Sequence, residues 1–210
     1  CDRDVDAINE PRRPIPSGRM PAKWGLAIAI VMSLASLALA WCLGIWGFIA
    51  TILAVICAWV YSLEPFRFKK SGVLGPLLVG FCYEGLPWFT GAAILSVGMP
   101  NQKTILVAIL FALGAFGIMI LNDFKAIEGD KQTGVNSLPV SMGSRKAAKL
   151  ACISMIIPQV AVVCLMLMWN MLIFSLIILV AVLLQIIAMS KLLKNPQHFA
   201  PWYNQTGVTL

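Results

Sequence analysis

The sequence predicts an all-α protein built as a polytopic bundle of transmembrane helices, and two observations support this. Hydrophobic residues make up 60% of the chain and the mean hydropathy is +0.86, although a soluble domain of 210 residues has no need for so much apolar surface. These residues are also gathered into runs that approach the roughly 20 residues an α-helix needs to cross a bilayer. Because a helix satisfies its own backbone hydrogen bonds in lipid, such runs indicate membrane spans.

Six runs are expected to form these spans. They cover residues 24–43, 45–61, 73–97, 104–121, 150–169 and 171–190. A further apolar run begins at Val208, and the chain starts in a polar motif without an initiator methionine. We therefore expect a single transmembrane domain over residues 1–210 that is truncated at both ends.

Positive charge alternates along the chain in step with the predicted spans. Of the 16 lysines and arginines, all but Lys103 lie in residues 1–23, 62–72, 122–149 and 191–205. By the positive-inside rule these four segments are cytoplasmic, and each span crosses the bilayer once. The net charge of +7 then reflects topology and attraction for anionic lipid or substrate, and we expect no nucleic-acid partner.

The most informative segment follows the fourth predicted span, at residues 121–131. Asp123 and Asp130 are seven residues apart, which on a helix is two turns, or roughly 10 Å, on nearly the same face. Two carboxylates placed so at a membrane boundary repel each other unless a cation lies between them. Mg²⁺ is the expected cation because it prefers carboxylate and phosphate oxygens. The alternative is an ordinary solvated loop after a membrane helix.

A second acidic face opens the chain. Asp2 and Asp6 are four residues apart, on one face of a helix, and a loop rich in proline that carries Arg13 and Arg19 follows them. Carboxylates can hold a metal ion, and arginines can bind phosphate oxygens through two parallel hydrogen bonds. The alternative is that these acids simply pair with the arginines.

The loop after the second span carries a further cationic candidate. Arg67 follows Pro65, which breaks the helix. Arg67, Lys69 and Lys70 of this loop can neutralise a diphosphate, and Lys125 in the later acidic segment is a further candidate. The alternative, above all for Lys70, is that these cations only snorkel to the membrane surface.

Glu84 is an acid inside the third predicted span, where a carboxylate is costly and is a functional-site candidate by default. Tyr83 and Trp88 offer aromatic faces beside it, and Pro87 is expected to kink the helix. We expect these residues to contact a flat pigment. The alternative is a hydrogen bond between Glu84 and a neighbouring helix.

Other polar residues of the spans carry less information. Gln159 and Gln185 are isolated in the last two spans, and packing is the better explanation for them. The single histidine, His198, lies in the last predicted loop. The chain therefore offers no evident strong general base.

The two acidic faces, each with basic residues nearby, predict one site made of two halves. Its ligand must be anionic, bound to Mg²⁺ and attached to a membrane-soluble group, and a prenyl diphosphate meets all three conditions. A transporter or a structural membrane protein is the alternative class. Transporters place charges near the bilayer midplane, whereas eight of the nine acids here lie at the predicted cytoplasmic edge.

The motifs resemble those of the UbiA superfamily of intramembrane prenyltransferases. That family carries an Asn-Asp-x-x-Asp-x-x-x-Asp motif, whose last two acids match Asp2 and Asp6, and a second Asp-rich motif that Asp123 and Asp130 match. The leading Asn-Asp of the first motif would precede Cys1. The resemblance covers essentially the whole chain and implies a bundle of about nine helices, of which the first and last are missing here.

Residues 2–18 and 122–130 resemble the chlorophyll synthase branch of the superfamily, and residues 83–88 and 201–204 look closer to its bacteriochlorophyll-forming members. This implies esterification of the propionate of bacteriochlorophyllide a with geranylgeranyl or phytyl diphosphate. It also implies Mg²⁺ as cofactor, a bacterial inner, photosynthetic membrane and protein partners from the pigment pathway. The alternative acceptors are chlorophyllide, a quinone precursor or haem. An ionised propionate attacks an allylic cation directly, so no strong base is required.

The expected roles of the candidate residues follow from these arguments. The expected Mg²⁺ ligands are Asp2, Asp6, Asp123 and Asp130, the expected diphosphate contacts are Arg13, Arg19, Arg67 and Lys125, and the expected pigment contacts are Tyr83, Glu84 and Trp88.

Overall fold

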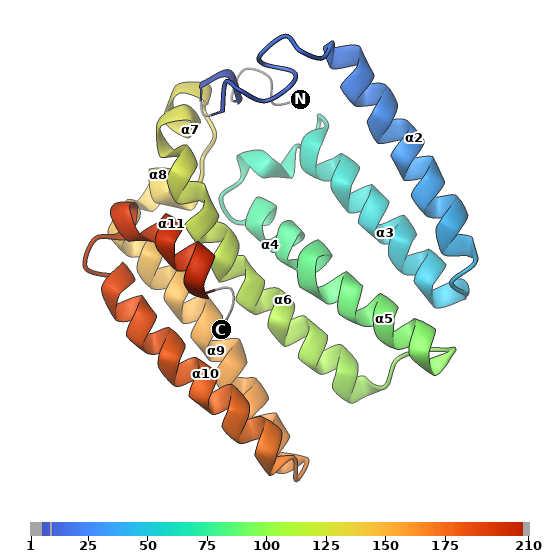
Figure 1. Ribbon diagram of the computed structural model, residues 1–210, viewed down its shortest axis with the longest axis vertical. Coiled ribbons are helices and arrows are strands. Elements are labelled where there is room, and N and C mark those ends of the chain that lie inside the picture. The colour runs from blue at the N-terminus through green and yellow to red at the C-terminus, as the bar shows by residue number, and fades with distance from the viewer. Residues whose placement is uncertain (1–5, 9, 208–210) are drawn as a thin grey trace.

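The computed structural model describes residues 6–8 and 10–207, and this part of the chain is helical and contains no named β-strand (Figure 1). The predicted all-α fold is thus confirmed. The α-helices are α2 (Ala22–Trp41), α3 (Ile45–Ser62), α4 (Leu74–Gly80), α5 (Leu86–Ser96), α6 (Gln102–Asn122), α7 (Ile127–Thr133), α8 (Leu138–Met142), α9 (Ser144–Met168), α10 (Leu172–Leu192) and α11 (Pro196–Gly207). The shorter elements are η1 (Phe68–Lys70), η2 (Phe81–Gly85) and η3 (Asp123–Ala126).

Six helical segments of the described chain are long and apolar enough to cross a membrane, in agreement with the six predicted spans. They are α2, α3, Leu74–Ser96, Gln102–Thr133, α9 and α10. Helix α9 differs from prediction at its start, since it begins at Ser144 rather than at residue 150. Its first turns carry Arg145, Lys146 and Lys149, so the hydropathy of the sequence rises only after the helix has begun.

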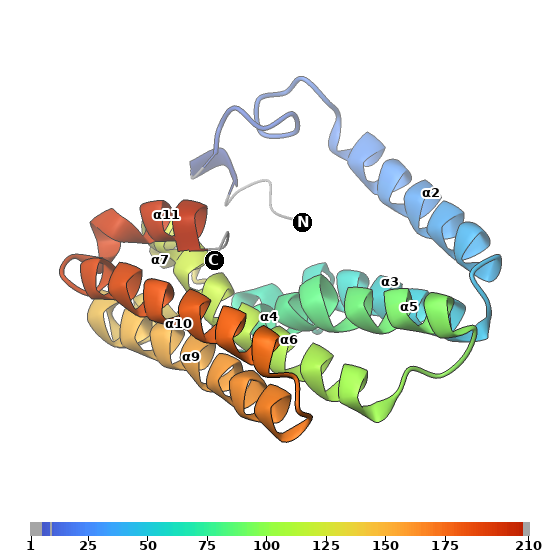
Figure 2. The same ribbon diagram turned by 60° about the horizontal axis from the view of Figure 1, so that its bottom comes forward.

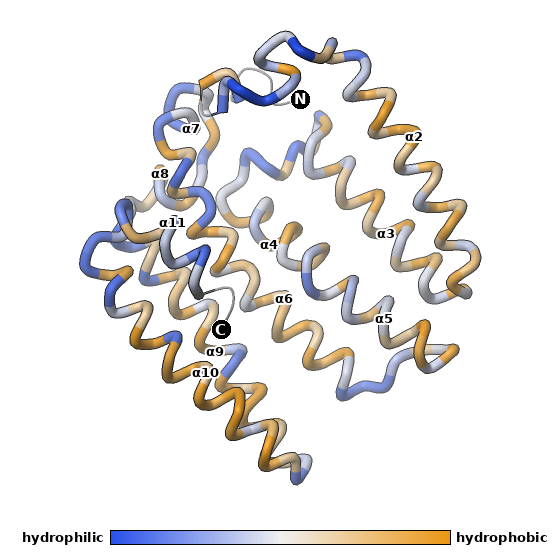
Figure 3. The backbone as a smooth tube through the Cα atoms, in the orientation of Figure 1, coloured by the Kyte–Doolittle hydropathy of each residue, from blue (hydrophilic) through white to orange (hydrophobic). Residues whose placement is uncertain are grey.

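The connections that carry the charged residues gather at one end of the bundle. Figure 1 shows the segment before α2, the α3–α4 connection and the α6–α7 region at this end, whereas the α2–α3, α5–α6 and α9–α10 turns lie at the other. Colouring by hydropathy places the polar residues largely at the first end and apolar residues along the helices (Figure 3). The alternation along the sequence therefore corresponds to helices that run back and forth between two ends.

Helix α6 runs through the middle of the molecule and packs against α4 and α9. Figure 2 shows α2 standing away from the body at one side, where it packs on α3, with α9, α10 and α11 at the other side. The core lies around α6, α9, α10 and α11. Residues of these four helices also line the larger of the two cavities described below.

Small residues bring α6 and α9 into close contact. Ala147, Ala148 and Ala151 of α9 are completely buried. A Cβ atom added to Gly117 of α6 would lie 2.5 Å from the carbonyl oxygen of Ala151, so the two backbones touch at this point. Small side chains at such a crossing allow membrane helices to pack closely, which compensates for the lack of a hydrophobic driving force between helices in lipid.

The third span is interrupted by a π-helical turn, η2, rather than by the simple proline kink that the sequence predicts. The backbone N–H of Leu86 donates to the carbonyl of Phe81, five residues earlier. Pro87 has no N–H, so it cannot continue the regular ladder, and a wider turn accommodates it. The turn holds Glu84 on the wall of a cavity.

The last predicted loop is instead the helix α11, which begins with Pro196 and includes His198. Proline is favoured in the first turn of a helix, where its missing N–H has no partner to lose. Ala200 and Tyr203 of α11 are buried in the core. The prediction of a loop at His198 is therefore wrong, and α11 packs against α6, α9 and α10 instead.

Candidate functional site

A polar pocket of about 170 Å³ lies at the charged end, between η1, the end of α6 and α7. Asp123 and Asp130 line it together with Arg67, Lys69 and Lys70. Hence acids and bases that are more than 50 residues apart in the sequence share one small cavity. This is the arrangement expected for a metal–diphosphate complex, whose charges require both signs nearby.

The two aspartates reach this pocket by a route that differs from the predicted one. They do not lie on one continuous α-helix, because the 3₁₀ turn η3 begins at Asp123 and separates α6 from α7. Phe124 of this turn is buried in the core. The turn leaves both aspartates on the pocket although they do not lie on one continuous α-helix, and their role as metal ligands stays a prediction.

The environment of these carboxylates suits a divalent cation. Asp130 is buried and Asp123 is half-buried, and their charges are close enough to repel each other. Within the described residues, neither carboxylate forms an ion pair with a lysine or an arginine. Two sequestered negative charges that repel each other and lack a direct ion pair to a described residue are costly, so a bound cation would stabilise them. No described group of three or more acidic, histidine or cysteine side chains is close enough to hold a metal by itself. Mg²⁺ commonly uses one or two carboxylates and completes its shell with substrate phosphates and water.

Two cations of the pocket pair with a carboxylate that does not line it. Glu64 accepts hydrogen bonds from Arg67 at 3.1 Å and from Lys70 at 3.2 Å. Both hydrogen bonds hold the pKa of Glu64 below its ordinary value, and the bond from Arg67 has the larger effect. Glu64 therefore stays ionised and competes with an anionic ligand for both cations.

The first acidic segment is only partly described, since Asp2 lies outside the described residues. Asp6 pairs with Arg13 at 3.0 Å, and Arg13 also donates to Glu10 at 2.6 Å. The hydrogen bond from Arg13 lowers the pKa of Glu10, and Lys125 lies 4.0 Å from the same carboxylate. These contacts correspond to the alternative in which acids and arginines pair, and they tie this segment to η3 through Lys125.

Four of the predicted site residues lie outside the polar pocket. Asp6, Arg13 and Lys125 take part in the ion pairs just described, and Arg19 donates to the hydroxyl of Ser17 at 3.1 Å and to the carbonyl of Arg12. None of the four is among the residues that line the pocket with Asp123. Their roles as metal or diphosphate ligands stay predictions.

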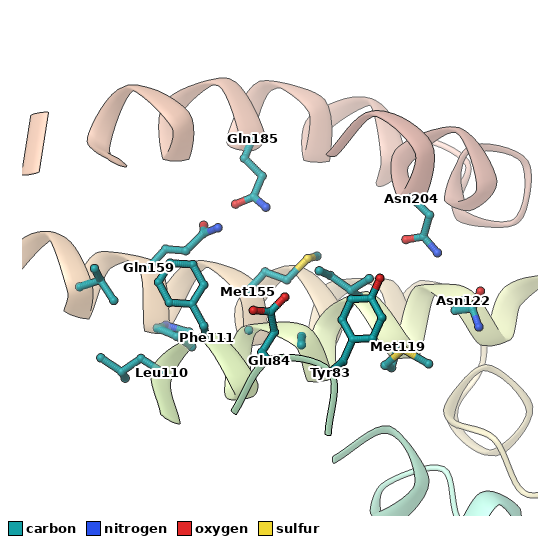
Figure 4. Close-up of a pocket in the computed structure, with 15 residues that line it drawn as sticks. Tyr83, Glu84, Leu110, Phe111, Met119, Asn122, Met155, Gln159, Gln185 and Asn204 are labelled. Carbon is teal, nitrogen blue, oxygen red and sulfur yellow. The ribbon is translucent and has the colours of Figure 1, made fainter. Parts of the chain in front are cut away.

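A larger cavity of about 520 Å³ opens next to the polar pocket, and Met119 of α6 lines both. Its size falls within the ~300–1,000 Å³ of typical ligand sites. The walls are mostly apolar, and a few polar side chains face inward (Figure 4). These are Tyr83, Glu84, Asn122, Gln159, Gln185 and Asn204. A hydrophobic ligand here would lie directly below an anionic group in the polar pocket.

Two of the three predicted pigment residues, Tyr83 and Glu84, line this cavity, and Trp88 contacts Glu84. Glu84 accepts a hydrogen bond from the indole N–H of Trp88 at 3.0 Å, and Trp88 stacks on Phe111 with ring centroids 5.3 Å apart. The bond is therefore made within the third span and not to a neighbouring helix. Tyr83 is 70% exposed although it lines the cavity. Trp88 donates to Glu84 but is not among the residues that line the cavity.

Sequence reasoning missed several polar residues of the two cavities. It attributed Gln159 and Gln185 to packing and assigned no role to Asn122 or Asn204. The available signal was the rarity of polar side chains inside apolar spans, which usually marks a functional position. The sequence could not indicate that residues of α9, α10 and α11 face the same space.

Comparison with known proteins agrees with this geometry. The sequence pattern of the UbiA prenyltransferase family matches residues 1–205. A bacteriochlorophyll synthase 33 kDa chain from Cereibacter sphaeroides is 57% identical over 210 residues, covering 100% of this chain and 70% of that protein. A protein of the same name from Rhodobacter capsulatus is 53% identical, with coverage of 100% and 70%. Chloroplastic chlorophyll synthase from Avena sativa is 35% identical, with coverage of 98% and 56%.

The fold has a counterpart among solved structures. A structure from a study of digeranylgeranylglyceryl phosphate synthase in membranes matches with a TM-score of 0.70 and 24% identity, over 97% of this chain and 71% of that one. At this identity the match supports the fold, while the family match rests on the sequence. The apolar spans, the shared helical architecture and the match over residues 1–205 together show that this integral membrane protein belongs to the UbiA prenyltransferase family.

Proposed function

We propose that this prenyltransferase esterifies the propionate of bacteriochlorophyllide a with geranylgeranyl or phytyl diphosphate and releases diphosphate. The proposal rests on one observation. A single pocket is lined by two aspartates and three basic residues, and it adjoins a large, mainly apolar cavity. The residues are Asp123, Asp130, Arg67, Lys69 and Lys70. The 57% identity to a bacteriochlorophyll synthase chain supports the choice of acceptor.

The polar pocket would bind the diphosphate of the donor. Asp123 and Asp130 would hold Mg²⁺, while Arg67, Lys69 and Lys70 neutralise the phosphate oxygens. When bound, Mg²⁺ supplies positive charge that stabilises the departing diphosphate. Asp2 and Asp6, with Arg13, Arg19 and Lys125, are proposed to complete this site from the first acidic segment. The ion pairs of Asp6, Arg13 and Lys125 would then exchange for contacts to the donor.

The reaction requires one bond to form and one to break. The bond between C1 of the prenyl group and its diphosphate oxygen breaks, and the electron pair leaves with the diphosphate. A propionate oxygen forms the new bond to C1. The propionate is ionised near neutral pH, so the protein need not remove a proton. The cavity residues orient the acceptor and exclude water from the allylic cation.

The charge pattern also supports an orientation. We propose that the end with the polar pocket faces the cytoplasm of a bacterial inner membrane, because all lysines and arginines but Lys103 fall in residues 1–23, 62–72, 122–149 and 191–205, and the described parts of these segments include the connections and helix ends on that side. The donor and pigment would then enter from the cytoplasmic side or from the bilayer. Proteins of the pigment pathway are proposed as partners that deliver or receive the pigment.

The function is tested with membranes that contain the full-length protein. They are incubated with Mg²⁺, geranylgeranyl or phytyl diphosphate, and one acceptor at a time: bacteriochlorophyllide a, chlorophyllide, a quinone precursor or haem. We expect esterified bacteriochlorophyllide as the main product. Preferred prenylation of a quinone precursor or haem would show that the acceptor is assigned wrongly.

Glu64→Gln is expected to strengthen donor binding. The change removes one acidic partner from Arg67 and Lys70 without altering the size of the side chain. Because exposed pairs are weak, KM for geranylgeranyl diphosphate should fall by no more than about fivefold, with kcat unchanged. Steady-state kinetics of this variant and of Glu128→Gln, an exposed acid outside the pocket, provide the comparison. A higher KM in Glu64→Gln would contradict the proposed role of these cations.

Glu84→Leu is expected to impair use of the pigment more than use of the donor. The change removes the acceptor of the Trp88 hydrogen bond and a polar group from the cavity wall. KM for bacteriochlorophyllide should rise about tenfold, while KM for the prenyl diphosphate changes little. Glu84→Gln keeps an acceptor oxygen and should be tolerated. Equal effects on both substrates would assign Glu84 to structure alone.

A further inference from the structure

Gln159 of α9 presents a hydrogen-bond donor to the larger cavity, which it lines (Figure 4). Its side-chain oxygen is fully buried and accepts no hydrogen bond from a described residue. Its side-chain nitrogen is not enclosed in this way, and it is bonded to no described residue either. An amide nitrogen carries two N–H donors, so a ligand in the cavity meets a donor at this position.

Gln159 lies at the deep end of the cavity, away from the polar pocket. Helices α6 and α9 run in opposite directions (Figure 1), and they touch where a Cβ atom added to Gly117 would lie 2.7 Å from Cγ of Met155. From this contact, Asn122 is five residues toward the polar pocket on α6, whereas Gln159 is four residues in the opposite direction on α9. At about 1.5 Å per residue, the levels of Asn122 and Gln159 are roughly 13 Å apart.

Gln185 of α10 lines the same cavity at a shallower level. The hydroxyl of Ser175 donates to the carbonyl of Val163 at 3.1 Å, which fixes the register between α10 and α9. From this contact toward the polar pocket, Gln185 is ten residues along α10 and Gln159 is four residues along α9. Gln185 therefore lies roughly 9 Å nearer to the polar pocket. Of these two glutamines, Gln159 is the one placed to reach the far end of a ligand that is anchored at that pocket.

The wall around Gln159 is otherwise apolar. Pro158 and Val162 line the cavity next to it on α9, and Leu110 and Phe111 line it from α6 at a similar depth by the same register. A donor in such a wall has no partner in the protein to return to when a ligand displaces water. A ligand with an acceptor atom at this position is therefore favoured, and one without it leaves the N–H of Gln159 unpaired.

The proposed acceptor carries a suitable oxygen in a suitable place. In bacteriochlorophyllide a the propionate and the ring keto group lie toward one edge of the macrocycle, and the acetyl group projects from the opposite edge. Esterification requires the propionate at the polar pocket, beside C1 of the donor. The acetyl group then points away from this pocket, into the deep end of the cavity. A carbonyl oxygen only accepts hydrogen bonds, so it complements an amide N–H.

We infer that the side-chain amide of Gln159 donates a hydrogen bond to the acetyl oxygen of the tetrapyrrole acceptor and thereby selects for it. This inference rests on the proposed function, since it requires bacteriochlorophyllide in the cavity. Chlorophyllide carries a vinyl group in the position of the acetyl group, and a vinyl group has no acceptor atom. Gln159 is thus a residue of specificity and positioning, and it takes no part in the making or breaking of bonds.

The test compares two pigments that differ in one group: bacteriochlorophyllide a and its analogue in which vinyl replaces acetyl. Both are titrated into purified full-length protein in lipid nanodiscs, and binding is followed by pigment absorption. Gln159→Met and Gln159→Leu remove the donor, Gln185→Met removes an amide at the shallower level, and Gln102→Met is an exposed control at the start of α6. Each variant must first bind geranylgeranyl diphosphate with Mg²⁺ as the unchanged protein does, which shows that it is folded.

The unchanged protein should bind the acetyl pigment about tenfold to hundredfold more tightly than the vinyl analogue. Both Gln159 variants should bind the two pigments about equally, because the donor that distinguishes them is gone. Gln185→Met and the control should keep the preference. Resonance Raman spectra of the bound pigment should show the acetyl C=O stretch at a lower frequency in the unchanged protein than in an aprotic solvent. This shift reports the hydrogen bond itself, so it tests the inference even if neither Gln159 variant folds.

Three results would overturn the inference. They are equal affinity of the unchanged protein for the two pigments, a preference that survives in the Gln159 variants, and an acetyl stretch that matches the pigment in aprotic solvent. Loss of the preference in Gln185→Met alone would also overturn it, because the ring would then lie at another depth. All these results leave the proposed function intact, since the pigment still binds. Failure of the unchanged protein to bind either pigment overturns the proposed function, and the inference with it.

Discussion

Asp123→Asn is expected to reduce prenyl transfer by at least about 100-fold while the protein stays folded in the membrane. The carboxylate of Asp123 lies in the polar pocket with Asp130, and the neutral amide would bind Mg²⁺ much more weakly. Loss of the positive charge opposite the departing diphosphate removes stabilisation that is strongest in the transition state, and losses of ~10²–10³ are typical for such groups. The effect should therefore appear in kcat as well as in donor binding.

The measurement is a titration of activity with Mg²⁺ for the unchanged protein, Asp123→Asn and a matched control. Glu128→Gln is a suitable control because Glu128 is an exposed acid of the neighbouring helix α7 and bonds only to Gln132 among the hydrogen bonds seen here. EDTA should abolish activity of the unchanged protein, and added Mg²⁺ should restore it. Full activity in EDTA, or in Asp123→Asn, would refute a metal site at these aspartates.

Gly117→Ala should destabilise the folded protein more than any single change in the loops. The added Cβ would lie 2.5 Å from the carbonyl oxygen of Ala151 and 2.7 Å from Cγ of Met155. The carbonyl belongs to the backbone of α9 and cannot rotate away, so α6 and α9 must separate. Overpacking of this kind typically costs about 1–3 kcal/mol, and the separation would also disturb the cavity between the two helices.

Gly114→Ala is the matched control, because Gly114 lies one turn away on the same helix and an added Cβ meets nothing within 4 Å. Alanine has a higher helix propensity than glycine, so this variant should be as stable as the unchanged protein or more so. Thermal unfolding in detergent, followed by the loss of monodisperse protein, gives the ranking. Equal unfolding temperatures for Gly117→Ala and Gly114→Ala would show that the α6–α9 contact is not as tight as described.

The sequence was a good guide wherever a property depends on local composition. The span of α10 is recognisable because its residues are apolar throughout, and lipid requires such a length whatever its neighbours are. The start of α9 was missed because three basic residues occupy its first turns and lower the hydropathy there. His198 was misplaced in a loop because α11 is too polar to read as a span.

Spacing along the sequence was a weaker guide to the site. The argument that Asp123 and Asp130 share a helical face assumed a continuous helix, whereas the 3₁₀ turn η3 divides it. Their meeting in one pocket with Arg67 depends on how η1 and α4 pack beside α6, which no local pattern encodes. The pairing of Asp6 with Arg13 was foreseen only as the alternative to metal binding.

The sequence by itself determined the membrane class, the order of the spans, the acidic and basic segments and the family to which their motifs belong. These are properties of residue type and order. Because lipid offers no hydrogen-bond partners to the backbone, a long apolar run must be a helix whatever it packs against. Only the tertiary structure decided which polar side chains share a cavity. Gln159, Gln185 and Asn204 come from three helices, and they line one cavity because α9, α10 and α11 pack against one another and around α6, which close contacts such as that of Gly117 with Ala151 hold against α9. Such contacts depend on small residues, which do not stand out in an apolar sequence. The polar residues that line the cavity could therefore be identified only from the packed helices.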